Sequence, residues 1–249
     1  MNNEVIAGFK KDFLAIKEKG FVPSTRIHDT GIGKTFEDLV GIHENNNFLA
    51  DYGDALEIKS SRELSASMMT LFTKSLSNPK QVNSVLCQRY GKPDKDFPNL
   101  RILHTTVTAT DFNTFEKKYG FKLQVSEQLG VIYLVIKDLQ TGQVDDAQPY
   151  FAFDDLRERV EKKCKHLAYI SAESKKEGGK EFFKFNKAVL LSGLTFEKFI
   201  DCMKKGLIVY DIRLGAYRSG KMMGKPHDHG SGFRVLKRNL SKVFDMQEL

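Results

Sequence analysis

The sequence is poor in the residues that build disulfide frameworks and membrane spans. It has no tryptophan and only three cysteines among its 249 residues, at Cys87, Cys164 and Cys202. An odd number of widely spaced cysteines argues against a disulfide framework and a zinc cluster, and it is typical of thiols in a reducing cytoplasm. No apolar run reaches the roughly 18 residues that a membrane helix needs, and the first residues lack the basic and then apolar layout of a secretion signal. These absences predict a soluble, cytoplasmic protein without a membrane partner.

Acidic residues are outnumbered, because 39 Lys and Arg stand against 32 Asp and Glu, which gives a net charge of +7 and a pI near 9.1. This excess favours a polyanionic partner but does not distinguish DNA from RNA or an anionic membrane surface. With 41% hydrophobic and 11% aromatic residues, the chain can bury a core and is not a disordered chain. Its length suits one large domain or two lobes.

A nucleotide-binding loop is suggested by the GIGKT at residues 31–35, but its pattern is incomplete. The Walker pattern needs a glycine five residues before the glycine of the Gly-Lys-Thr, and His28 occupies that position. The preceding residues STRIHDT do not form a hydrophobic strand either. The sequence therefore argues against a phosphate-binding loop here.

Hydrophobic periodicity alternates between helical and extended patterns along the chain. Residues 4–18 and 194–206 have apolar positions at helical spacing. Residues 173–181, ESKKEGGKE, are expected to form a loop. Strands are predicted from their β-branched residues at 101–109, 121–127, 130–138 and 207–215. This mixture predicts an α/β or α+β core.

The stretch DYGDALEIKSS at residues 51–61 contains two carboxylates and a lysine in a strand-like pattern. Alternation places Glu57 and Lys59 on one side of the strand and Leu56 and Ile58 on the other. Asp51 lies just upstream, across a predicted turn. Two hard oxygen ligands for Mg²⁺ and a lysine that orients water are the set that a metal-dependent nuclease needs. The alternative is a solvated Glu/Lys pair on an exposed strand face.

Most of the net charge is concentrated in residues 211–242, where eight Lys and Arg stand against two Asp, leaving +6. Arginines pair with guanine or phosphate, aspartates accept from cytosine, and histidines can meet base edges. Acidic residues within a basic segment favour a base-reading surface over a purely electrostatic one. Two alternatives are lysines that contact only phosphate and a zinc site at the His-Asp-His of residues 227–229.

Several stretches together resemble one family. In order they are TGIGKTFEDL, D…LEIK, TLFTKS…NPK…RYGK and DIRLGAYRSGK…HDHG…FR. The order and content of these stretches, from about residue 30 to 235, resemble the MvaI/BcnI type II restriction endonucleases, of the MutH-like branch of the PD-(D/E)XK nucleases. The HDHG and IRLGAYRSGK stretches are closer to the MvaI than to the BcnI type.

The resemblance implies a PD-(D/E)XK restriction-endonuclease-like core, of mixed α/β class, in two lobes around a DNA cleft. Residues 1–145 would form the catalytic lobe and residues 146–249 a second lobe with recognition elements. Asp51, Glu57 and the carbonyl of Ile58 would bind Mg²⁺, and Lys59 and Glu37 would complete the catalytic set. Asp54 is a rival to Asp51 as the first carboxylate.

The resemblance also implies a type II site-specific deoxyribonuclease that acts on double-stranded DNA as a monomer. It would cut the strands one after the other at a CC-N-GG site, in the form CCWGG, and leave 5′-phosphate ends. A cognate DNA methyltransferase would act on the same site without a stable complex. The DNA-binding residues would be Lys74, Asp211, Arg213, Arg218, Lys225, His227, Asp228, His229 and Arg234. Two alternatives stay open: a MutH-like repair nicking enzyme that needs partner proteins, and a DNA-binding protein that has lost catalysis.

Overall fold

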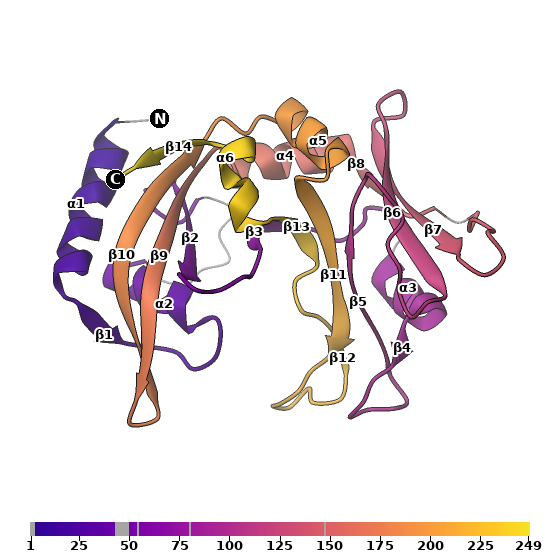
Figure 1. Ribbon diagram of the computed structural model, residues 1–249, viewed down its shortest axis with the longest axis horizontal. Coiled ribbons are helices and arrows are strands. Elements are labelled where there is room, and N and C mark those ends of the chain that lie inside the picture. Colours follow the sequence, from indigo (N-terminus) through magenta and orange to yellow (C-terminus); the bar gives the residue numbers. More distant parts are fainter. Residues whose placement is uncertain (1–2, 43–49, 54, 80, 147) are drawn as a thin grey trace. The chain divides into compact units, whose positions relative to one another are not determined.

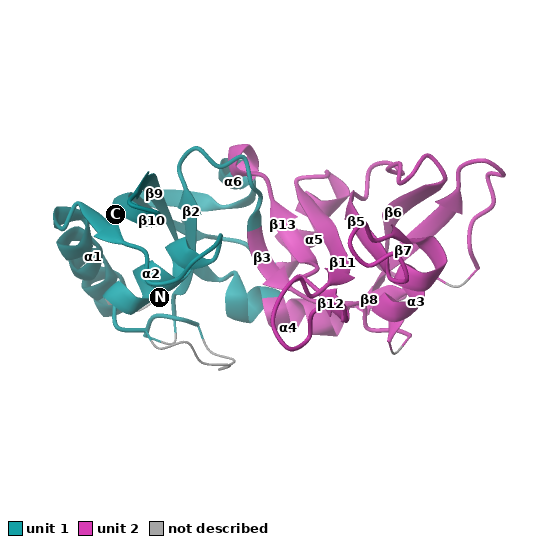
Figure 2. Cartoon of the chain, turned by 90° about the horizontal axis from the view of Figure 1, so that it is seen from below, with its two compact units in different colours: residues 1–69, 160–195, 240–249 teal, residues 70–159, 196–239 magenta. Residues whose placement is uncertain are grey.

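The computed structural model describes residues 3–42, 50–53, 55–79, 81–146 and 148–249. Its contacts divide the chain into two units, residues 1–69, 160–195 and 240–249, and residues 70–159 and 196–239 (Figure 2). The expected single boundary between residues 145 and 146 does not coincide with this division. The reason is that residues 57–62 pair with residues 167–172 in one sheet, although residues 70–159 of the second unit lie between them in the sequence. No helix in the described part of the chain is long and apolar enough to cross a membrane.

The first unit is built on a sheet with the strand order β1-β10-β9-β2, in which β14 also pairs with β10 (Figure 1). Strand β2 runs parallel to β9, with Glu57 opposite Leu167, and β9 is antiparallel to β10. The strands are β1 (Phe21–Pro23), β2 (Glu57–Arg62), β9 (His166–Glu177), β10 (Lys180–Ser192) and β14 (Asp245–Glu248). The helices of this unit are α1 (Asn3–Glu18), α2 (Gly31–Leu39) and the short α6 (Leu240–Val243).

Helix α1 confirms the prediction at residues 4–18 and contributes one face to the core of this unit. Phe9, Phe13 and Ile16 are buried at helical spacing. They belong to a cluster with Phe36 of α2 and Ile58 of β2. Helix α2 also packs against β2. The apolar side of the short β2 is therefore fixed by helices that come before it in the chain.

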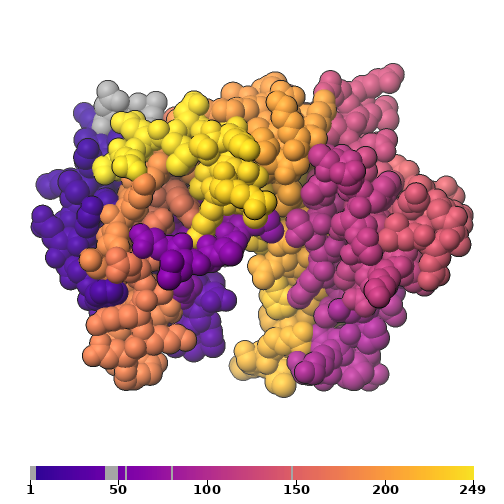
Figure 3. Space-filling model, in the orientation of Figure 1, coloured from indigo at the N-terminus to yellow at the C-terminus, as the bar shows by residue number. Residues whose placement is uncertain are grey.

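The segment at residues 173–181 is a strand hairpin, so the predicted loop is wrong. Strand β9 continues to Glu177 and β10 begins at Lys180. Between them Gly178 and Gly179 both have positive φ, at 56° and 76°, as a two-residue hairpin turn requires. The tip of this hairpin projects at the surface (Figure 3). Its charges lie on exposed strands, where charged side chains are tolerated.

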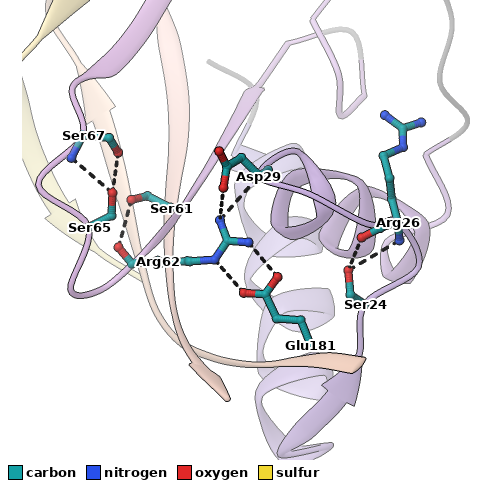
Figure 4. Close-up of polar contacts among 8 residues, drawn as sticks. All are labelled: Ser24, Arg26, Asp29, Ser61, Arg62, Ser65, Ser67 and Glu181. Carbon is teal, nitrogen blue, oxygen red and sulfur yellow. Dashed lines mark hydrogen bonds and ion pairs between the residues drawn. The ribbon is translucent and has the colours of Figure 1, made fainter. Parts of the chain in front are cut away.

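An arginine clasp ties the end of β2 to this hairpin (Figure 4). Nε and Nη2 of Arg62 each donate to the carboxylate of Glu181 at 2.8 Å. The guanidinium also lies over the ring of Phe183, 5.3 Å from its centroid, and 3.8 Å from the carboxylate of Asp29. A bidentate pair of this kind fixes direction as well as distance, so the clasp helps to hold β2 in place.

The second unit contains two sheets, of strand order β3-β13-β11-β5-β4, with β12 paired to β11, and β6-β7-β8. The first comprises β3 (Met69–Thr73), β4 (Lys92–Pro93), β5 (Arg101–Val107), β11 (Ile208–Ala216), β12 (Pro226–Asp228) and β13 (Gly232–Val235). The other comprises β6 (Tyr119–Ser126), β7 (Val131–Asp138) and β8 (Tyr150–Ala152). The helices are α3 (Val82–Tyr90), α4 (Phe153–Lys163, whose last turn belongs to the first unit), α5 (Phe196–Lys204) and the 3₁₀ turn η1 (Lys237–Asn239). The prediction of a mixed α/β fold is confirmed.

Candidate functional site

A tight turn before β2 places Asp51 beside the start of the strand. The backbone N–H of Tyr52 donates to the carbonyl of Leu56 at 2.9 Å, and that of Leu56 donates back to Tyr52 at 3.1 Å. The Tyr52 hydroxyl donates to Asp12 at 2.6 Å, and its ring packs edge-on against Phe9. Helix α1 thus anchors the turn, and the turn sets the position of Asp51.

The side chains of β2 alternate as the sequence predicts. Leu56 and Ile58 are 0% and 5% exposed and face the core. Glu57 faces the other side, yet it is also only 5% exposed. The alternative of a solvated Glu/Lys pair is therefore wrong for Glu57, which is a buried carboxylate. A buried carboxylate is costly unless it is paired.

Two lysines pair with this carboxylate. Lys59 Nζ lies 2.7 Å from Oε1 of Glu57, and Lys163 Nζ lies 3.0 Å from Oε2. Lys163 is the last residue of α4 and was not found from the sequence. Its only local signal is a run of basic residues at a helix end, which is also what the helix dipole favours. The parallel pairing of β2 with β9, the strand that follows α4, brings this helix end to Glu57.

Asp51 and Glu57 are close enough for their charges to interact. Burial, and then the charge of Glu57, raise the pKa of Asp51. The opposing influences are a hydrogen bond from the N–H of Ile58, at 2.9 Å to Oδ2, and the charges of Lys59 and Lys163. The two carboxylates therefore repel each other in a half-buried position, and a divalent cation bound between them would lower this repulsion.

The carbonyl of Ile58 is positioned to join them. Among the described residues, strand β2 is at the end of its sheet, so one of its backbone edges has no partner strand in that part of the chain. The N–H of Ile58 points to this edge, because it donates to Asp51. In a strand the N–H and C=O of one residue point to the same side, so the carbonyl lies there too. Two carboxylates and one carbonyl are hard oxygen donors, which suit Mg²⁺.

The described residues hold no group of three or more His, Cys, Asp and Glu side chains able to bind a metal. A metal at Asp51 and Glu57 would thus depend on the backbone, on water or on substrate for its remaining ligands. Glu37 is half-buried on α2, the helix that packs against β2, and its catalytic role stays a prediction. Asp54 lies outside the described residues. The GIGKT residues lie inside α2, where Lys34 pairs with Asp38, which agrees with the rejection of a phosphate loop.

In the second unit, β11 carries polar side chains on one face of its sheet. Asp211 accepts from the hydroxyl of Thr106 at 2.9 Å and lies 3.0 Å from Nε of Arg234. Arg213, two residues along β11, has a side chain that is 46% exposed, whereas that of Arg234 is 10% exposed. The guanidinium of Arg234 is therefore held within the sheet face, and that of Arg213 projects from it.

A histidine cluster covers the next position of the same strand. A Cβ on Gly215 would lie 3.1 Å from the ring of His229 and 3.2 Å from Nε2 of His104, so a larger residue there would require both rings to shift slightly. His227 stacks on Tyr217, with ring centroids 3.9 Å apart, and meets His229 edge-on. Burial lowers the pKa of His104 and His229. Both imidazoles are therefore neutral near pH 7, and each presents one donor and one acceptor nitrogen.

His104 was missed because it belongs to β5, more than a hundred residues before the basic segment. Only the pairing of β5 with β11, in which His104 lies opposite Arg213, brings it to this face. The zinc alternative at residues 227–229 finds no support among the described side chains.

Besides Asp211 and Arg234, three more of the predicted DNA-binding residues are engaged in contacts within the unit. Arg218 donates through both terminal nitrogens to the buried Asp94, and this pairing lowers the pKa of Asp94 to about 2. Asp228 Oδ1 accepts from the backbone and hydroxyl of Ser231, at 2.6 and 2.8 Å. These contacts shape the loops at the ends of β11 and β12.

The third is Lys74, whose ammonium lies 2.8 Å from Asp155. Lys225, by contrast, is exposed at the end of the turn before β12. The roles of all these residues in DNA binding stay predictions.

Comparison with known proteins places this geometry in a family. The model of the MvaI/BcnI restriction endonuclease family matches residues 10–244. A restriction endonuclease MvaI–cognate DNA substrate complex is 37% identical, with a TM-score of 0.92 over 100% of this chain and 99% of that one. Restriction endonuclease MvaI in the absence of DNA is 35% identical, with a TM-score of 0.61 over 100% and 98%. No curated protein matches the chain. With nearly its whole length matched, the chain belongs to the MvaI/BcnI restriction endonuclease family.

Proposed function

We propose that the protein is a sequence-specific, Mg²⁺-dependent endonuclease that hydrolyses phosphodiester bonds of double-stranded DNA. The observation that carries this proposal is the group formed by Asp51, the buried Glu57 and Lys59 at strand β2. A chain that had only to bind DNA would gain nothing from two carboxylates held close together. Family membership and the cognate DNA in a similar solved structure support the substrate class.

In this proposal each group of the site has a defined task. Asp51, Glu57 and the Ile58 carbonyl hold Mg²⁺, which supplies charge stabilisation at the phosphoryl oxygens. The ammonium of Lys59 is fixed by Glu57 and is 25% exposed, so it can orient a water molecule for in-line attack. Glu57 thereby serves both as a ligand and as the residue that positions Lys59. The products would carry 5′-phosphate and 3′-hydroxyl ends.

For the substrate site, we propose a sequence of CC-N-GG type, in the form CCWGG, cut one strand at a time by a monomer. Arg213 and the neutral imidazoles of His104 and His229 are the groups best placed to meet base edges, because Arg213 and His104 lie on neighbouring strands and His229 lies beside them at Gly215. The resemblance of residues 211–234 to MvaI supports the form of the site.

The test is digestion of unmethylated phage DNA by the purified protein, with and without Mg²⁺, followed by sequencing of the fragment ends. Discrete fragments with ends inside a CC-N-GG sequence, formed only with Mg²⁺, are expected. A smear would mean a non-specific nuclease. Intact DNA would favour a partner-dependent nicking enzyme if single nicks appear, or a binding-only protein if none do.

Gly215→Ala is expected to weaken binding of the cognate sequence by about tenfold, since a displaced base contact typically costs 1–3 kcal/mol. The added Cβ would push His104 and His229 out of place, as both rings lie within 3.2 Å of it. Affinity for unrelated DNA should not change, because non-specific binding depends on pairing of Lys and Arg with phosphates and the substitution removes no charge. Fluorescence anisotropy with cognate and unrelated duplexes measures both, and equal losses on the two duplexes would contradict the prediction.

A further inference from the structure

Both carboxylate oxygens of Glu57 are occupied by ammonium groups. Oε1 lies 2.7 Å from Lys59 and Oε2 lies 3.0 Å from Lys163. The Glu57 side chain is 6% exposed, and those of Lys59 and Lys163 are 25% and 17% exposed. A divalent cation bound to Glu57 would therefore lie close to two ammonium groups that already pair with this carboxylate. At such short range and low exposure, repulsion between like charges is screened only weakly.

The two lysines differ in how they are held. Lys59 lies two residues from Glu57 on the same face of β2, so the strand itself keeps it beside the carboxylate. Lys163 comes from the last turn of α4, a different element, and reaches Glu57 through a long flexible side chain. Its ammonium can move away from Oε2 without any change in β2. Lys163 is therefore the partner that a metal can displace.

We propose that Lys163 is a positioning residue that acts as the counter-ion of Glu57 in the metal-free protein and competes with the divalent cation for it. The inference rests on the proposed function, because it assumes that Glu57 is a metal ligand. In the absence of metal, Lys163 keeps a buried carboxylate neutralised and in place. It also makes the site bind the cation more weakly than its oxygen ligands alone would.

This competition couples metal binding to DNA binding. A DNA phosphate offers the displaced ammonium of Lys163 a new anionic partner, so phosphate and cation assist each other at the site. By linkage, DNA then tightens metal binding by the same factor by which metal tightens DNA binding. Lys163 would in this way keep the cation site weak until DNA is bound.

The test is calorimetric titration of the DNA-free protein with Mg²⁺, for the wild type, Lys163→Met and Lys163→Arg. Removing the competing charge should tighten Mg²⁺ binding about three- to tenfold, in the range of partly buried ion pairs. Lys163→Arg should stay near the wild type, because it keeps the charge. The melting temperature without metal should fall for Lys163→Met, since Glu57 loses a partner. Lys165→Met, an exposed lysine two residues on, is the matched control.

A merely structural role predicts the opposite sign, because a distorted site binds metal more weakly. Unchanged or weaker binding by Lys163→Met would overturn the proposal. If that variant does not fold, Lys163→Gln replaces it, as an amide can still donate to Oε2 without a charge, and the same tightening is expected. In a second titration with Ca²⁺ and a cognate duplex, DNA should tighten Ca²⁺ binding less in Lys163→Met than in the wild type. An equal effect of DNA on both proteins would overturn the coupling.

The wild type separates the two claims. If it neither binds Mg²⁺ nor cuts DNA, the proposed function fails. If it does both while Lys163→Met binds Mg²⁺ no more tightly, only the role of Lys163 fails.

Discussion

Lys59→Ala should lower the rate of DNA cleavage by about 10³-fold, which is typical of losing a side chain that positions or stabilises the reacting groups. The ammonium of Lys59 is held 2.7 Å from Glu57 and remains partly exposed, so it can meet an attacking water. Binding of cognate DNA should be nearly unaffected. The reason is that the proposed base-reading groups lie on a different sheet, around β11.

The measurement is a single-turnover cleavage assay on a plasmid with one cognate site, together with a band shift without Mg²⁺. Lys11→Ala, which removes an exposed lysine from α1, controls for the loss of one positive charge. Cleavage within tenfold of the wild type would remove Lys59 from the mechanism. Loss of both binding and cleavage would point instead to a damaged fold, which circular dichroism would detect.

The local pattern of β2 could be predicted from the sequence, and its electrostatics could not. Alternation over four residues was enough to place Glu57 opposite Ile58. The burial of Glu57 and its pairing with Lys163 depend on β9 and α4, which lie about a hundred residues further along the chain. Strand periodicity says which side a residue faces, but not what will cover that side.

The same limit applies to the basic segment. Its composition predicted a polar face, and β11 has one. The engagement of Arg218 by Asp94, and the approach of His104, arise from strand and loop neighbours that are distant in sequence. At residues 173–181 a local signal did exist, because Gly-Gly between two extended runs is typical of a hairpin. The prediction of a loop did not use this signal and was therefore wrong.

The binding-only alternative can be weighed on physical grounds. A carboxylate with a raised pKa beside a buried second carboxylate costs stability in the metal-free protein. A protein that has lost catalysis has no need to keep such a cost, and neutral substitutions would relieve it. The intact group of Asp51, Glu57 and Lys59 therefore favours an active nuclease.

Asp51→Asn should separate the contribution of Asp51 to cleavage from its effect on stability. Cleavage should fall by at least about 10²-fold, because the variant loses a charged metal ligand. The fold should be kept, since the amide oxygen of Asn can still accept the hydrogen bond that Asp51 takes from the N–H of Ile58. Asp54→Asn is the comparison that decides between the two candidate carboxylates. If Asp54→Asn abolishes cleavage and Asp51→Asn does not, the assignment is reversed.

Whereas cleavage should fall in Asp51→Asn, the stability of the metal-free variant should rise above that of the wild type. Burial and the charge of Glu57 raise the pKa of Asp51 above its ordinary value of 3.8, so the folded protein disfavours the ionised form. Well below pH 3.8, Asp51 is neutral in both the folded and the unfolded chain, and the variant gains nothing. As the pH rises through the raised pKa, the unfolded wild type ionises more readily than the folded one and the wild type loses stability. Thermal melts in EDTA at a series of pH values should therefore show Asp51→Asn becoming the more stable protein towards neutral pH.

Added Mg²⁺ should raise the melting temperature of the wild type but not that of the variant, because only the wild type keeps the charged carboxylate of Asp51 that binds the cation. A variant that is less stable than the wild type at neutral pH in EDTA would show that Asp51 is held by contacts stronger than the repulsion from Glu57.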